Sequence, residues 1–153
     1  MKFSELAKYL EKLEGTGSRL EMTRILAELF AKTEPEEARL VAYMTQGRLG
    51  PAYRSPDFGV ADKQMLKALG PKANELFGKL GDLGMTAEKL KIQMTNNKSN
   101  SKLKIQEVYG KLLEIAEAGG QGSQEKKQKS IADLVADLDP VGAKYAVKMI
   151  LGK

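Results

Sequence analysis

The sequence predicts an all-α fold: a single compact multi-helix domain built from a repeated trio of helices, related by a pseudo-two-fold axis, with inserted short helices. Residues that favour helices over strands dominate the 153 positions, while aromatic residues make up 6% and Trp is absent. Apolar residues recur at helical spacing along most of the chain. The chain also repeats itself, so the helices of its first part are expected again in its last part.

The first helix is predicted from an apolar face. Phe3, Leu6, Leu10 and Leu13 lie three or four residues apart, which places them on one side of a helix. The glycines of residues 15–17 end it.

The next two helices are predicted from their starts. Ser18 is expected to cap the second helix, with Glu21 completing a capping box. Pro35 suits the first turn of a third helix that runs to about Gln46. Residues 47–60 are rich in glycine and proline and form a long irregular loop.

The remaining elements are short helices followed by a second trio. A polar stretch at residues 96–101 has nothing to bury and is expected to be mobile. The expected helices span about 61–69, 72–80, 86–94, 104–118, 123–138 and 141–151.

An internal repeat organises the chain. A shift of 105 lays residues 17–48 on residues 122–153 without a gap, and a shift of 102 lays Phe3 on Ile105. The matched pairs include Gly17/Gly122, Ser18/Ser123, Leu29/Leu134, Pro35/Pro140, Met44/Met149 and Gly47/Gly152. Repeat one therefore covers about residues 2–48, an inserted loop and helices 49–94, a mobile linker 95–103, and repeat two 104–153.

The repeat also bears on the end of the chain. Repeat one continues past Gly47 and Arg48 into a loop and another helix, whereas repeat two stops at Gly152 and Lys153. A natural C-terminus is one interpretation; a cut through a larger protein is the one we favour.

Each repeat carries candidate phosphate contacts. A helix start offers unpaired N–H groups and a partial positive charge, and both Gly17-Ser18 and Gly122-Ser123 precede basic residues. Each repeat then ends in glycine and a basic residue. For either serine alone, a plain helix cap is the simpler explanation. A protein with two-fold symmetry can offer similar contacts to both strands of a duplex, and phosphate contacts carry no sequence information.

Composition excludes several classes of function. The chain has no cysteine and no histidine, which removes thiol chemistry, the usual neutral-pH acid or base, and the commonest zinc ligands. The net charge of +5 suits a polyanionic partner. No apolar run is long enough to span a bilayer and no signal peptide is evident, so we expect an intracellular protein without membrane contact.

Seven stretches resemble the N-terminal region of archaeal and eukaryotic-type ATP-dependent DNA ligases. They cover essentially the whole chain in order: residues 1–7, 18–23, 46–51, 58–61, 81–84, 122–127 and 143–145. The resemblance implies the all-helical domain with which this family binds nicked duplex DNA across the minor groove, in replication, repair and recombination. By position it implies DNA contacts at Ser18, Arg19, Gly47, Arg48, Phe58, Gly59, Val60, Gly122, Ser123, Lys126, Lys127, Gly152 and Lys153.

The resemblance also places the chemistry elsewhere. The family's adenylated lysine lies in a Lys-x-Asp-Gly motif that this sequence lacks, so ATP and magnesium are expected to belong to catalytic domains outside the chain, which itself needs no cofactor. A sliding-clamp motif with paired Phe occurs in some relatives near residues 93–101, and this chain has no aromatic residue there. We expect a monomer that binds DNA and is not an enzyme on its own. The alternatives are a helical scaffold that docks a sliding clamp or repair partner, and a regulator that occupies nicks without sealing them.

Overall fold

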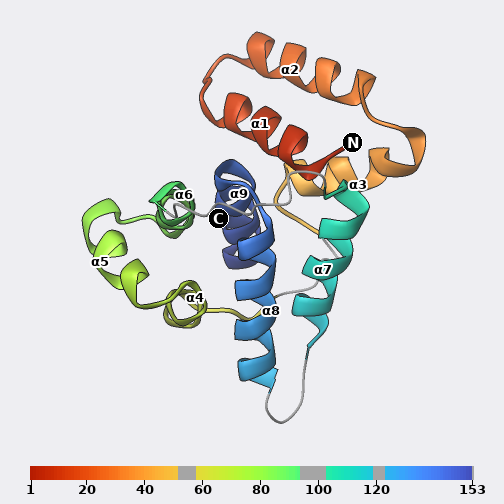
Figure 1. Ribbon diagram of the computed structural model, residues 1–153. Coiled ribbons are helices and arrows are strands. Elements are labelled where there is room, and N and C mark those ends of the chain that lie inside the picture. Colours follow the sequence, from red (N-terminus) through yellow and green to blue (C-terminus); the bar gives the residue numbers. More distant parts are fainter. Residues whose placement is uncertain (52–57, 94–102, 119–122, 153) are drawn as a thin grey trace.

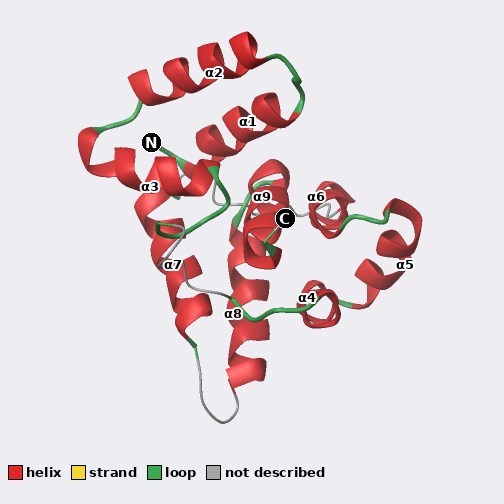
Figure 2. Ribbon diagram, turned by 180° about the vertical axis from the view of Figure 1, so that it is seen from behind, coloured by secondary structure: helices red, strands yellow, loops and turns green. Residues whose placement is uncertain are grey.

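The computed structural model describes residues 1–51, 58–93, 103–118 and 123–152, and these are all-helical apart from turns and loops. The all-α prediction is confirmed. Seen from both sides in Figures 1 and 2, α1, α2 and α3 form one group, α7, α8 and α9 a second, and α4, α5 and α6 an arc beside α8 and α9. The helices are α1 (Phe3–Glu14), α2 (Arg19–Ala31), α3 (Pro35–Thr45), α4 (Asp62–Leu69), α5 (Pro71–Leu80), α6 (Leu83–Gln93), α7 (Ile105–Glu117), α8 (Ser123–Asp137) and α9 (Pro140–Leu151).

The two trios exchange contacts as a two-fold axis requires. Helix α1 packs on α9 and α7 packs on α3, while α1 pairs with α2 as α7 pairs with α8. Lys2 and Lys104, which the shift of 102 residues relates, form an antiparallel β-bridge. In it, the Phe3 N–H donates to the Leu103 carbonyl (2.9 Å) and the Ile105 N–H donates to the Met1 carbonyl (3.0 Å). A shift of 102 residues turns one of these hydrogen bonds into the other, so the pseudo-two-fold axis passes through the bridge.

The core is built from positions that the repeat relates. Burying apolar side chains supplies most of the driving force for folding, and both members of each pair contribute. The pairs, all buried, are Phe3/Ile105, Leu6/Val108, Leu10/Leu112, Leu29/Leu134 and Met44/Met149.

The inserted helices are attached to the second trio. Helix α4 packs on α8 and α6 packs on α9. The Lys91 ammonium at the end of α6 is buried and donates to the Ala136 carbonyl near the end of α8 (2.7 Å). Burial lowers the pKa of Lys91.

Helix α6 begins three residues earlier than predicted. The sequence predicts a start at about residue 86. In the structure the Asp82 carboxylate accepts the Met85 N–H (2.9 Å) and the Asp82 carbonyl accepts the Thr86 N–H (2.9 Å). This cap starts the helix at Leu83 in spite of Gly84.

The polar stretch at residues 96–101 and most of the predicted linker lie outside the described residues. No helix in the described part of the chain combines the length and apolarity needed to cross a membrane.

Candidate nucleic-acid interface

The start of α2 exposes the first predicted contact. Ser18 has extended backbone angles, and its hydroxyl accepts the Glu21 N–H (3.3 Å), as a helix cap does. The predicted capping box is only half formed, since the Ser18 N–H donates to the Thr16 hydroxyl (3.2 Å) and the Glu21 carboxylate pairs with Arg24. Gly17, Ser18 and Arg19 are all exposed, so this helix start is open to solvent.

The start of α8 separates two adjacent lysines that were predicted to act together. Gly122 and the side chain of Ser123 lie outside the described residues. Lys126 is exposed, whereas Lys127 is only 9% exposed. The Lys127 ammonium donates to the Phe58 carbonyl (2.6 Å) inside the protein.

The ends of α3 and α9 match each other closely. Gly47 and Gly152 have φ of 71° and 72°, a left-handed conformation that glycine adopts without steric cost. The Gly47 N–H donates to the Met44 carbonyl (2.9 Å) and the Gly152 N–H donates to the Met149 carbonyl (3.2 Å). Both glycines are exposed, so two repeat-related turns present their backbone to solvent.

A basic residue follows each of these turns in the sequence. The Arg48 side chain is exposed and its guanidinium lies 3.3 Å from the Gln46 side-chain oxygen. That contact is an exposed hydrogen bond that a stronger acceptor can replace. Lys153 lies outside the described residues.

The third predicted contact, residues 58–60, is partly core. Phe58 is only 6% exposed and belongs to the hydrophobic core, so its side chain is not available to a ligand. Val60 is half-buried against the core, and Gly59 is exposed. The backbone at Gly59 is what this segment presents to solvent.

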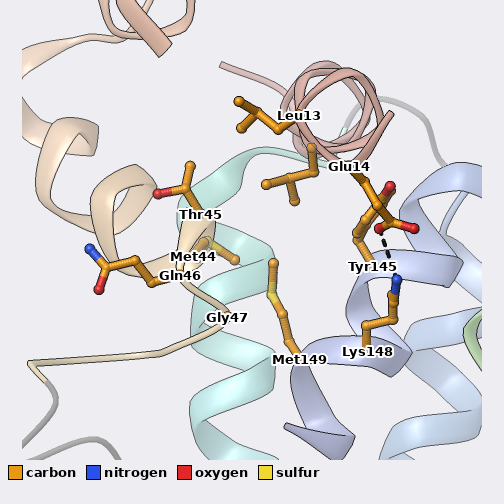
Figure 3. A pocket seen from close by; sticks show the side chains of 10 residues that line it. Leu13, Glu14, Met44, Thr45, Gln46, Gly47, Tyr145, Lys148 and Met149 are labelled. Atoms are coloured by element: carbon orange, nitrogen blue, oxygen red, sulfur yellow. Dashed lines mark hydrogen bonds and ion pairs between the residues drawn. The ribbon is translucent and has the colours of Figure 1, made fainter. Parts of the chain in front are cut away.

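A cleft of about 340 Å³ lies between the ends of α1, α3 and α9 (Figure 3). Leu13 and Met149 contribute apolar walls, and Glu14 accepts a hydrogen bond from the Lys148 ammonium (2.8 Å) at its side. This hydrogen bond outweighs burial and lowers the pKa of Glu14, while burial, followed by the Glu14 carboxylate, raises the pKa of Tyr145. Because Glu14 neutralises Lys148, we assign this cleft no role in binding an anion.

The sequence did not reveal Tyr109 of α7 as part of this region. Its hydroxyl donates to the carbonyl of Leu49, one residue beyond Arg48. The two residues are 60 positions apart, and no local pattern connects them.

Comparison with known proteins identifies the family. Residues 2–153 match the family described as DNA ligase N terminus. The chain belongs to this DNA ligase N-terminal family. The resemblance inferred from the sequence is therefore confirmed, and it extends over nearly the whole chain.

The relatives of this DNA ligase N-terminal domain include archaeal and bacterial proteins. It is 37% identical to DNA ligase 2 of Thermofilum pendens over 166 residues, which cover 99% of this chain and 28% of that protein. It is 36% identical to a probable DNA ligase of Dictyoglomus turgidum (100% of this chain, 27% of that protein). It is also 36% identical to the DNA ligase of Sulfolobus acidocaldarius (100% and 28%). The chain thus spans less than a third of the length of the relatives it matches.

Proposed function

We propose that this DNA ligase N-terminal domain binds duplex DNA through its phosphates, without reading base sequence, and holds a nick for sealing by other parts of a ligase. The observation that carries the proposal is the pair of turns at Gly47 and Gly152. They are related by the repeat, have nearly equal left-handed φ angles, and are each followed by a basic residue. A duplex offers two phosphate backbones related by local dyads, which a two-fold protein suits.

Charge supports a polyanion as the ligand. The net charge is +5. Three of the predicted contacts, Arg19, Arg48 and Lys126, are exposed basic side chains. A helix start adds N–H donors and a partial positive charge at Ser18. We propose that these groups contact phosphates across the minor groove, and that the exposed backbone at Gly59 lies at the same surface.

We assign the sealing reaction, with its ATP and magnesium, to other parts of a whole ligase. The contribution that we propose for this domain is to bind and orient the DNA.

Titration of the chain onto labelled nicked duplex, intact duplex and single strand tests the proposal. We expect binding to duplexes of unrelated sequence with similar affinity, weaker binding to single strand, and no sealed product when ATP and magnesium are added. Absence of duplex binding at low salt would refute the proposal for this domain. Binding only to a sliding clamp or repair protein, with weak dependence on salt, would instead support the scaffold alternative.

A further inference from the structure

The two described flanks of the segment between α3 and α4 are each held by a side chain of the second repeat. On one side, the Tyr109 hydroxyl of α7 donates to the Leu49 carbonyl. On the other side, the Lys127 ammonium of α8 donates to the Phe58 carbonyl (2.6 Å). These partners are 60 and 69 residues apart in sequence, so only the fold brings them together. Figure 1 shows α7 and α8 side by side below α3.

The Lys127 side chain is buried and holds the backbone of another segment. Its side chain is 9% exposed, and a Cβ atom added at Gly59 would lie 3.6 Å from its ammonium nitrogen. Lys127 also lies four residues before the fully buried Ile131, on the inward face of α8, whereas Lys126 is exposed. A phosphate contact would require the Lys127 ammonium to leave a buried hydrogen bond and expose an unpaired carbonyl.

Leu49 and Phe58 are each held by two kinds of contact, one to the side chain and one to the backbone carbonyl. Leu49 and Phe58 are 2% and 6% exposed, so their side chains are held in the core while their carbonyls are held by Tyr109 and Lys127. The exposed neighbours, Arg48 and Gly59, are each one residue away from an anchored carbonyl. Groups that bind a ligand lose less entropy when the protein holds them in place beforehand.

We propose that Tyr109 and Lys127 are positioning residues for DNA binding: they hold the backbone beside Arg48 and Gly59 in place and do not contact phosphate themselves. This inference rests on the proposed DNA-binding function. It assigns adjacent lysines opposite roles, with Lys126 as the phosphate contact and Lys127 as the anchor.

Three single variants of the chain test the inference: Lys127→Met, Tyr109→Phe and, as the matched control, Lys126→Ala. The first readout is amide hydrogen exchange, which needs no DNA, at residues 59–61 for Lys127→Met and at residues 49–50 for Tyr109→Phe. The second is duplex affinity at several salt concentrations, because each lost phosphate contact makes the slope of log K against log salt shallower by about 0.9. Far-UV circular dichroism checks that each variant is folded.

Lys127→Met is expected to speed exchange at residues 59–61 and to weaken duplex binding, each by about tenfold, as expected for loss of one buried hydrogen bond. The slope of log K against log salt should change in Lys127→Met by less than half of its change in Lys126→Ala. Tyr109→Phe alters no charge and should weaken binding with an unchanged slope. Lys126→Ala should make the slope shallower by about 0.9 and leave amide exchange at residues 59–61 unaltered.

Two results would overturn the positioning roles. One is a slope change in Lys127→Met equal to that in Lys126→Ala, which would make Lys127 a phosphate contact. The other is wild-type exchange and affinity in folded Lys127→Met and Tyr109→Phe. If the wild-type chain binds no duplex, the proposed function fails, while the exchange measurement still reports whether Lys127 holds the loop.

Discussion

Gly84→Ala tests the close approach of α6 to α9. A Cβ atom at position 84 would lie 2.9 Å from the Lys148 Cγ and 3.2 Å from the Lys144 carbonyl oxygen. The carbonyl belongs to the backbone of α9, and the Lys148 side chain is held by its hydrogen bond to Glu14 (2.8 Å), so neither neighbour yields freely. The added methyl group must therefore push the two helices apart or displace the Lys148 side chain and the backbone of α9 at Lys144.

The magnitude follows from two opposing effects. Overpacking a well-filled contact costs about 1–3 kcal/mol, and replacing glycine by alanine in a helix recovers up to about 1 kcal/mol. We expect a net loss of about 1–2 kcal/mol in the free energy of unfolding. For a domain of this size, this corresponds to a fall of about 2–8 °C in Tm.

The matched control is Gly110→Ala in α7. Gly110 is exposed, and a Cβ atom there would meet no other atom within 4 Å. This variant should gain about 0.5–1 kcal/mol from helix propensity and raise Tm. Thermal unfolding followed by circular dichroism compares the two. A Tm of Gly84→Ala equal to or above wild type would show that α6 and α9 do not approach as closely as the structure has them.

Two further predictions concern the end of α1 and the start of α2. Ser18→Ala removes the hydroxyl that accepts the Glu21 N–H and should cost about 1 kcal/mol in unfolding free energy, measured by urea titration; no loss would mean that the cap contributes nothing. In the folded protein the pKa of Glu14 lies below its ordinary value of 4.5, mainly because of the Lys148 hydrogen bond. Ionised Glu14 therefore stabilises the fold above pH 4.5, and this stabilisation is lost as the pH falls through the lowered pKa of the folded state. Glu14→Gln should therefore show a shallower fall of Tm in acid than wild type, by a small amount because the Glu14 side chain is 47% exposed, and an unchanged acid limb would contradict the assignment.

Periodic apolar residues and start signals predicted most of the helices. Helices α1 and α7 have repeat-related apolar faces, Pro35 marks the start of α3, and α3 and α7 begin within a residue of the predicted positions. The repeat was visible because equivalent core and turn positions keep similar residues. The start of α6 was missed because the capping role of Asp82 depends on hydrogen bonds to the Met85 and Thr86 N–H groups, which the apolar spacing does not reveal.

The candidate interface was less predictable than the fold. Lys126 and Lys127 are chemically identical, and only their positions relative to Ile131 distinguish an exposed lysine from a buried one. That signal was present in the helical spacing of α8 but was outweighed by the basic run around it. The contact from Tyr109 to Leu49 could not be predicted, because it joins a helix face to a loop through the tertiary fold alone.

The salt dependence of duplex binding tests the central claim most directly. Wild type, the double variant Arg48→Ala with Lys126→Ala, and the control Lys79→Ala on the outer helix α5 would be titrated with one nicked duplex over a range of salt. If both residues contact phosphates, the slope of log K against log salt should become shallower by about 1.8 in the double variant and remain at the wild-type value in Lys79→Ala. Equal slopes for all three proteins, or no duplex binding by wild type at the lowest salt, would contradict the account.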